Sequence, residues 1–264
     1  MTYLRKRNSN LCGLRICPLF ATLRGLLRPS TLTGLLLFLS ASLHTHAETL
    51  DYRVEWRLIQ AGVAKITTTS TATGADTKLE MQSLGMVSRL FKVNDVYSVN
   101  LKSDLCAQTA HMMAEESSRK KETWITFNAP GTKTLFLEKD LIKNTTVQQE
   151  IPVPACVHDV VGGLLKMRTL KMAPGTVTSL PITNGKKFAE VRLEIQEREE
   201  VKTPAGTFKT MRMEAFLFNG VLYARAARCL IWVTDDEKRT PVQIQIRMRF
   251  HIGTVTLLLE KEGK

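Results

Sequence analysis

From residue 50 onward the chain alternates apolar and polar side chains with a period of two. In residues 50–57, leucine, tyrosine, valine and tryptophan alternate with charged residues. Successive side chains of a strand point to opposite faces, so this segment has one apolar and one charged face. The same alternation recurs in residues 97–101, 123–127, 190–196 and 242–250. Strands with one solvated face are typical of antiparallel sheets, and the pattern therefore predicts a mainly β protein.

Turn-forming residues separate these predicted strands. Gly, Pro, Asn or Asp occur in residues 73–76, 128–131, 183–186, 203–206 and 235–238. The strongest signal is Asn184-Gly185, which predicts a hairpin with a type I′ turn and positive φ at both central residues. The runs and turns together indicate about twelve to fourteen strands. Because so large a sheet curls or closes, we expect a strongly curved antiparallel sheet or an open β-barrel.

One segment near the middle of the chain predicts a helix. Asp159 is a favourable N-cap, apolar residues follow at spacings of three and four, and Pro174-Gly175 ends the pattern. Gly162-Gly163 lowers the helix propensity inside it. We therefore expect one short central helix over residues 159–170. A second, weaker helical turn is expected over residues 85–91.

The N-terminal segment has the pattern of a secretory signal peptide. The first 47 residues contain six basic residues and no acidic one, and residues 32–43 form an uncharged apolar run. Small residues at Thr45 and Ala47 place the cleavage site after Ala47. The apolar run spans only about 18 Å as a helix, less than the roughly 30 Å of a bilayer core. The sequence thus predicts a signal peptide over 1–47, one β domain over 48–264 and no stable membrane span after cleavage.

Three cysteines follow the predicted cleavage site. In an oxidising compartment this odd number indicates one disulfide and one free thiol. We favour a Cys106–Cys156 bridge, because Cys106 follows a strand-like run and Cys156 begins a rigid loop before the helix. Cys229 lies in an apolar run and is expected to be a buried strand residue. Three reduced, buried thiols remain the alternative on this evidence.

Patterns for catalysis or metal binding are weak. His111, His158 and His251 are far apart and have no metal-ligand spacing, so we expect no metal and no cofactor. The pair His158-Asp159 fits part of a hydrolase triad, but no Gly-x-Ser-x-Gly motif accompanies it. Asp159 is explained equally by a helix cap. We expect a non-enzyme and keep an envelope hydrolase using these two residues as an alternative. Nucleic-acid binding is disfavoured, because the strands lack surface aromatic residues on which bases stack.

Several motifs carry a family resemblance. They are Leu-x-Tyr-x-Val-x-Trp at 50–56 with Ala61-Gly62, Ser-x-Leu-Phe-Lys-Val-x-Asp at 88–95, Pro-Ala-Cys-Val-His-Asp at 154–159, the helix ending at Arg168, Thr-Pro-Ala-Gly-Thr-Phe at 203–208, and Ile-Trp-Val-Thr-Asp-Asp at 231–236 with Arg239, Pro241 and Val242. In order and spacing the chain resembles the domain-of-unknown-function family 3108 of exported bacterial envelope proteins, from about Leu50 to Leu259. The resemblance implies a mostly antiparallel β domain in the periplasm or outer-membrane space of a Gram-negative bacterium. It also supports the Cys106–Cys156 bridge. The family supplies no established reaction and therefore no catalytic residue.

The functional expectation follows from the long one-faced sheet and the missing catalytic cluster. We expect an apolar groove, plugged or flanked by the helix, that binds a lipid, a glycolipid or an envelope partner. A scaffold or adhesion module using exposed strand edges is a further alternative. The candidate ligand-binding residues are Trp56, Phe91, Ile125, Phe127, Trp232 and Leu257 in the interior and Arg168 near its mouth. For each of them, ordinary core packing or ion pairing is the competing interpretation.

Overall fold

The computed structural model describes residues 47–263 except 129, 219–221, 224–225 and 249–252. The chain separates into two units, Met1–Ser42 and Leu43–Lys264, and the described residues all belong to the second. The predicted signal peptide therefore lies outside the described residues, apart from Ala47 at the start of the first strand. None of the helices in the described part of the chain is long and apolar enough to span a bilayer.

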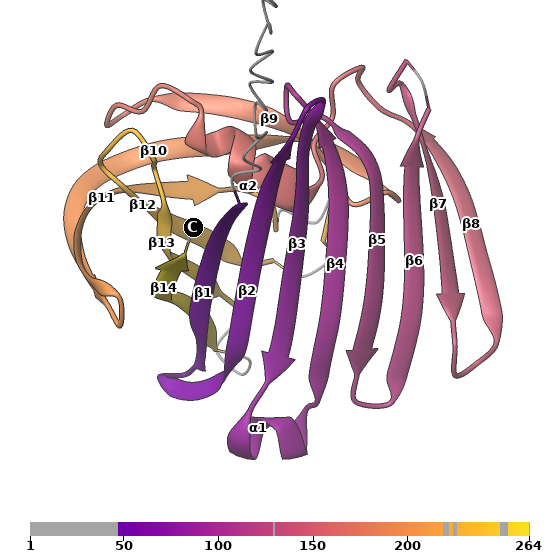
Figure 1. Ribbon diagram of the computed structural model, residues 1–264, viewed down its shortest axis with the longest axis horizontal. Coiled ribbons are helices and arrows are strands. Elements are labelled where there is room, and N and C mark those ends of the chain that lie inside the picture. Colours follow the sequence, from indigo (N-terminus) through magenta and orange to yellow (C-terminus); the bar gives the residue numbers. More distant parts are fainter. Residues whose placement is uncertain (1–46, 129, 219–221, 224–225, 249–252, 264) are drawn as a thin grey trace, which may run out of the picture. The chain divides into compact units, whose positions relative to one another are not determined.

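The described residues form fourteen strands in one antiparallel sheet (Figure 1). The first half contains β1 (Ala47–Trp56), β2 (Ile59–Thr71), β3 (Gly74–Ser83), β4 (Val93–Lys102), β5 (Ala107–Glu116), β6 (Arg119–Phe127), β7 (Lys133–Asp140) and β8 (Thr145–Pro152). The second half contains β9 (Val177–Thr183), β10 (Phe188–Thr203), β11 (Gly206–Ala215), β12 (Arg228–Thr234), β13 (Pro241–Arg247) and β14 (Thr254–Gly263). Strands that follow one another within each half are paired as predicted, and β1 pairs with β14. The two edges are β8 and β9, so the sheet is not closed.

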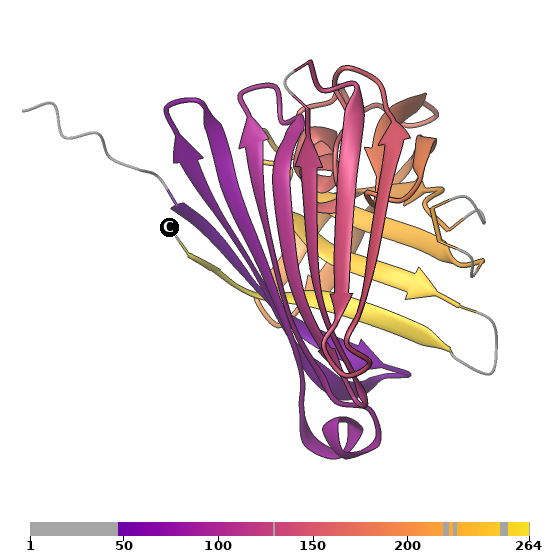
Figure 2. The ribbon, with the colours of Figure 1, turned by 90° about the vertical axis from the view of Figure 1, so that its right-hand side faces the viewer.

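The sheet curls around the helix α2 (Val160–Arg168), which connects its two edge strands. Strands β9–β14 turn across the concave side of β1–β8 (Figure 2). Helix α2 contacts β9 of one half and β3 and β4 of the other. A curled antiparallel sheet with a central helix is thus confirmed. The second helix, α1 (Gly85–Leu90), lies where the weaker helical turn was predicted.

Helix α2 begins where the sequence predicts and ends two residues earlier, at Arg168. The Asp159 side chain accepts hydrogen bonds from the backbone N–H groups of Val161 (2.9 Å) and Gly162 (3.0 Å), which is the expected N-cap. A Cβ atom at Gly163 would lie 2.5 Å from Cδ1 of Ile182 in β9. The glycine therefore allows the helix to approach the sheet closely, which offsets its low helix propensity.

Three apolar clusters form the core of the described residues, and strand β12 takes part in two of them. Cys229 and Ile231 belong to the cluster beneath α2, whereas Leu230 and Trp232 belong to the cluster against β1, β2 and β14. The long β10–β11 hairpin covers this second face, and its turn residue Ala205 donates a 3.0 Å hydrogen bond to β14. Both faces of β12 are therefore buried, which the alternating pattern alone does not predict.

One turn differs from the prediction. A hairpin does connect β9 to β10 at Asn184-Gly185, but only the glycine has positive φ, at 85°. The Asn184 side-chain oxygen accepts hydrogen bonds from the backbone N–H groups of Lys186 (3.0 Å) and Lys187 (2.9 Å). This side-chain turn stabilises a different backbone, so the type I′ prediction is wrong.

Candidate ligand cavity

An apolar cavity of about 240 Å³ lies between α2 and the concave face of the sheet. The helix lines it with Val160, Leu164 and Met167, and both halves of the sheet contribute further side chains. Nearly all of the lining is aliphatic or aromatic. An apolar cavity of about 150 Å³ already stays dry and binds a small hydrocarbon. The cavity therefore suits a single apolar chain or ring.

A tyrosine brings a polar group to this apolar lining. Tyr223 follows β11 in the chain, and its ring packs against that of Phe218 with centroids 5.1 Å apart. No described residue forms a hydrogen bond with the Tyr223 hydroxyl. Burial raises the pKa of Tyr223, and the Asp159 carboxylate adds to the increase. The hydroxyl thus stays protonated and remains able to donate a hydrogen bond.

A second polar group, the hydrogen-bonded pair of Tyr97 and Asp159, lies at the N-terminus of α2. The Tyr97 hydroxyl of β4 donates to Oδ2 of Asp159 at 2.9 Å. Burial raises the pKa of Asp159, although the hydrogen bonds from Tyr97 and the helix N–H groups act in the opposite direction. Burial and the nearby Asp159 also raise the pKa of Tyr97. Tyr97 and Asp159 thus satisfy each other at the start of α2, and neither belongs to the cavity lining.

The free cysteine also faces the cavity. Cys229 is buried in β12, as the sequence predicts, and is the free cysteine of the described residues. Burial, with a smaller contribution from Glu214, raises the pKa of its thiol to about 12. A thiol that stays protonated is a poor nucleophile. Cys229 therefore acts as an apolar lining residue.

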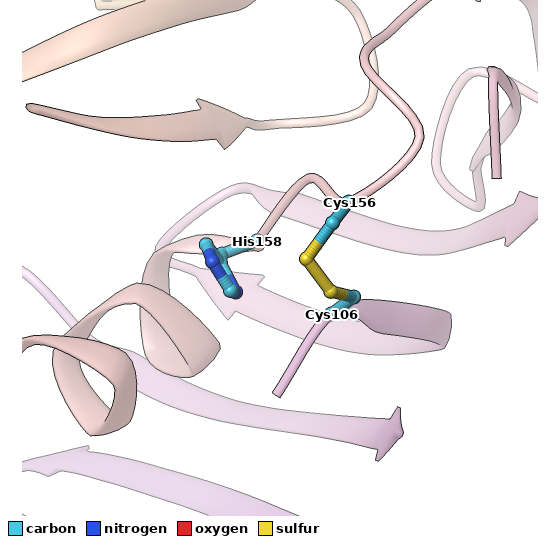
Figure 3. A group of neighbouring side chains, drawn as sticks. All are labelled: Cys106, Cys156 and His158. Atoms are coloured by element: carbon cyan, nitrogen blue, oxygen red, sulfur yellow. A yellow bond between two sulfur atoms is a disulfide. The ribbon is translucent and has the colours of Figure 1, made fainter. Parts of the chain in front are cut away.

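The segment before α2, residues 153–159, bridges the two halves of the sheet, and we call it the strap. Its residue Val157 accepts a 2.9 Å hydrogen bond from the N–H of Ala107 in β5. His158 exchanges two 2.9 Å backbone hydrogen bonds with β9, forming a parallel bridge opposite Ile182. The predicted disulfide joins Cys156 of the strap to Cys106 (Figure 3). The strap thus gives the two halves a second connection besides the β1–β14 pairing.

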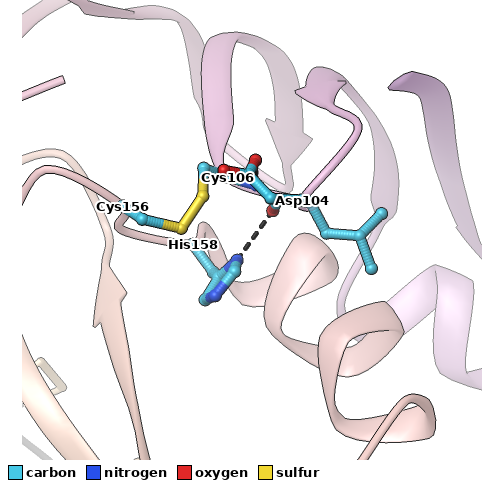
Figure 4. The surroundings of a disulfide bond; sticks show 5 residues. Asp104, Cys106, Cys156 and His158 are labelled. Atoms are coloured by element: carbon cyan, nitrogen blue, oxygen red, sulfur yellow. Dashed lines mark hydrogen bonds between the residues drawn. A yellow bond between two sulfur atoms is a disulfide. The ribbon is translucent and has the colours of Figure 1, made fainter. Parts of the chain in front are cut away.

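His158 and Asp159 have separate structural partners. Nδ1 of His158 bonds to the backbone oxygen of Leu105 at 2.7 Å (Figure 4), whereas both Asp159 oxygens bond to the helix N-terminus and Tyr97. Burial lowers the pKa of His158, which keeps its imidazole neutral. An acid–base pair needs the carboxylate to orient the imidazole. The geometry therefore gives the hydrolase alternative no support.

One group of possible metal ligands occurs among the described residues. The Sγ atoms of Cys106 and Cys156 and a ring nitrogen of His158 lie within 4.8 Å of one another (Figure 3). Metals are bound by thiolates, and both sulfurs are joined in the disulfide. The oxidised strap therefore offers a metal only the histidine.

Arg168 forms a structural ion pair. Its guanidinium binds Glu48 of β1 in a two-pronged contact of 2.6 and 2.8 Å and also donates to the backbone oxygen of Lys238. Burial acts to lower the pKa of Arg168, but the pairing with Glu48 outweighs it and raises the pKa. The arginine therefore ties the end of α2 to the first strand and the β12–β13 connection.

The other predicted site residues lie in different places. Leu257 of β14 lines the cavity, whereas Ile125 and Phe127 of β6 are buried in the neighbouring cluster. Trp232 is buried on the opposite face of β12 and donates from Nε1 to Glu199 at 2.7 Å. Half-buried Trp56 and exposed Phe91 lie outside the cavity lining, near the ends of β1 and α1.

The sequence pattern identifies neither Tyr223 in the cavity lining nor Tyr97 beside the helix cap. Tyr97 was recognised only as part of an alternating strand, and Tyr223 was not singled out. Strand periodicity indicates the buried face but not which segment distant in the chain covers it. The one local signal was Asp159, whose role as the helix cap places it beside Tyr97.

The fold and the cavity define a barrel-like protein made from a curled, unclosed sheet. The chain belongs to the DUF3108 family, described as proteins of unknown function, whose sequence profile matches residues 51–260. Among solved structures, the chain is similar to the beta-barrel-like protein of domain of unknown function DUF1849 from Brucella abortus. That likeness has a TM-score of 0.50 at 6% identity and covers 82% of this chain and 96% of the other.

A weaker structural likeness was found to a "putative lipoprotein" from Parabacteroides distasonis. It has a TM-score of 0.32 at 10% identity and covers 83% of this chain and 96% of that protein. No curated protein matches the chain. The likeness to the Brucella abortus protein agrees with the observed fold and leaves the ligand to be argued from the cavity.

Proposed function

We propose that the protein is an exported envelope protein that binds a single apolar chain with an uncharged polar head beneath α2, without chemically changing it. The cavity of about 240 Å³ is the observation that carries this proposal. At roughly 30 Å³ per water-sized group, it holds about eight such groups. Medium-length alkyl chains match that space, and longer acyl chains require α2 to move outward.

The polar groups set the preference for the head. Tyr223 offers a hydroxyl at the lining, and Asp159 makes an anionic head unfavourable whenever its carboxyl is ionised. An alcohol or a sugar hydroxyl accepts from a phenol without adding negative charge. Fatty alcohols, acylglycerols and glycolipids therefore fit better than fatty-acid anions.

Export to the periplasm is part of the same proposal. The basic and apolar pattern of residues 1–47 is that of a signal peptide cleaved after Ala47, leaving one domain over 48–264. Disulfides persist in oxidising compartments, and the Cys106–Cys156 bridge supports this location. N-terminal sequencing of the protein from a periplasmic extract checks it, with Glu48 expected as the first residue.

The binding proposal is tested by thermal unfolding with and without 1-decanol. A ligand that binds only the folded state raises the unfolding temperature. Ala215→Phe fills the cavity from β11, so the rise is expected to disappear in this variant. Ile125→Val is the matched control, because it changes the core outside the cavity lining and should keep the rise.

Tyr223→Phe separates the role of the head from that of the chain. We expect this variant to lose part of the stabilisation by 1-decanol and to keep stabilisation by decane, which lacks a hydroxyl. Equal stabilisation of wild type and Ala215→Phe would place the alcohol outside this cavity. No stabilisation of the wild type by either compound would also refute the proposal.

A further inference from the structure

Four connections between strands of the first half of the sheet lie side by side at one end of these strands. In a sequential antiparallel sheet, alternate connections lie at the same end, and Figure 1 shows these four at the end marked by α1. The N–H of Ser117 donates to the oxygen of Lys92, and that of Leu141 donates to the oxygen of Lys120, both at 2.8 Å. We call residues 57–60, 84–92, 117–120 and 141–144 the turn row.

The turn row displays large apolar side chains to solvent. Leu58 is 90% exposed, Met86 and Leu90 are 74% exposed, and Ile142 is 65% exposed. The other exposed members are Ile59, Phe91 and Leu141. Only three further large apolar side chains of the described residues are exposed, and they lie outside the row. Gathered apolar groups of this kind mark an interaction surface, whereas single ones are ordinary.

Two features show that these side chains do not pack into the apolar core. Helix α1 buries none of its residues. Leu58 lies in the left-handed region, with φ of 68°, a conformation that leucine adopts rarely. The chain therefore presents an apolar tip where a glycine or asparagine is the usual turn residue.

The charge of the turn row is of one sign. Its four segments contain six Lys and Arg residues and no Asp or Glu. Lys92 forms an ion pair with Glu115, whereas exposed Arg89, Lys120 and Lys143 form none with other described residues. Apolar side chains surrounded by basic ones are the combination that binds the surface of an anionic bilayer.

We propose that the turn row docks on an anionic lipid bilayer, with its apolar tips among the headgroups and its basic side chains against lipid phosphates. This surface is separate from the cavity, so docking goes beyond the proposed ligand binding and does not require it. The other end of the same half-sheet differs, because the described residues of its connections, 72–73, 103–106, 128 and 130–132, include no exposed large apolar residue.

The test is co-sedimentation of the protein, purified as the cell makes it, with lipid vesicles. We expect binding to vesicles of phosphatidylethanolamine and phosphatidylglycerol, weaker binding to phosphatidylcholine alone, and a decrease with added salt. The variant Met86→Glu/Leu90→Glu should reduce binding about tenfold or more. Leu135→Glu/Val147→Glu is the control, because these exposed apolar residues lie in β7 and β8 and should leave binding unchanged.

A second pair of variants tests the charge. Arg89→Gln/Lys143→Gln should weaken binding to the anionic vesicles, and Lys171→Gln/Lys187→Gln, which removes two exposed lysines elsewhere, should not. Unchanged binding of Met86→Glu/Leu90→Glu would overturn the proposal. So would absence of vesicle binding, even if the row captured an acidic protein instead. The 1-decanol measurement uses no vesicles, so docking and cavity binding can each fail alone.

Discussion

Asp159 is the residue that connects local sequence to the cavity. It caps α2, accepts a hydrogen bond from Tyr97 and contributes to the raised pKa of Tyr223. The sequence identifies the cap from the residue type and the following helical spacing. It does not reveal Tyr97 as a partner, because that contact joins residues 62 positions apart. Burial by distant segments, rather than the motif itself, determines the protonation of this carboxyl.

Two substitutions separate the cap from the charge. Asp159→Ala should lower the free energy of unfolding by about 1–2 kcal/mol, because helix N–H groups lose their acceptor. Asp159→Asn keeps an acceptor and should cost less. The folded-state pKa of Asp159 is raised above 3.8. Its contribution to the free energy of unfolding is therefore largest below pH 3.8 and decreases as the pH rises through the folded-state pKa. Denaturant unfolding over this range should therefore show that the free energy of unfolding of Asp159→Asn increases relative to that of the wild type as the pH rises.

His158 gives the opposite pH dependence. Its folded-state pKa is lowered from 6.5, so the unfolded chain takes up the proton first as the solution is acidified. The contribution of His158 is therefore complete above about pH 6.5 and is lost as pH falls toward the folded-state pKa. His158→Asn keeps a donor for Leu105 and should remove this part of the acid dependence. If the free energy of unfolding of His158→Asn falls as steeply on acidification as that of the wild type, the buried neutral imidazole does not cause this acid dependence.

At the level of elements, the strap and α2 connect the two edge strands, β8 and β9, which do not pair with each other. Helix position, its N-cap and the disulfide were predicted from local residues, as were the hairpin connections. The pairing of β1 with β14 was not, because register between strands so far apart depends on the whole curled sheet. The turn at Arg57-Leu58 was also missed, since neither residue is a turn former.

Removing the disulfide tests the strap. The bridge closes a chain separation of 50 residues, and Cys106→Ser/Cys156→Ser should lower the free energy of unfolding by about 4 kcal/mol. Cys229→Ala is the control for cysteine loss without bridge loss. Denaturant midpoints under oxidising conditions measure both variants. Equal midpoints for the double variant and the wild type would mean that the bridge does not constrain the fold.

Gly163 tests the close packing of α2 on β9. Gly163→Ala places a Cβ atom 2.5 Å from Cδ1 of Ile182 and should cost about 1–3 kcal/mol despite the better helix propensity of alanine. Ile182→Val removes that Cδ1 atom. The double variant should therefore be more stable than the sum of the two single effects predicts. Strict additivity in denaturant unfolding would contradict the close contact.

At the scale of the whole molecule, a helix held inside a curled sheet leaves apolar space between them. The sequence predicts the curl from the number of one-faced strands and predicts an apolar interior. It does not predict the cavity lining, because both faces of β12 are buried. Trp232 lies on the face that the β10–β11 hairpin covers, not on the face toward the cavity. Bulky side chains alone therefore did not identify the residues around the cavity.

The most direct test of ligand binding is the native mass of the protein purified from the periplasm. We predict a species heavier than the polypeptide, whose extra mass is released by organic solvent as an amphiphile with an apolar chain and an uncharged head. Ala215→Phe, prepared in the same way, should have the mass of the polypeptide alone. A wild-type protein that carries no extractable lipid, or a variant that retains the same extra mass, would contradict binding beneath α2.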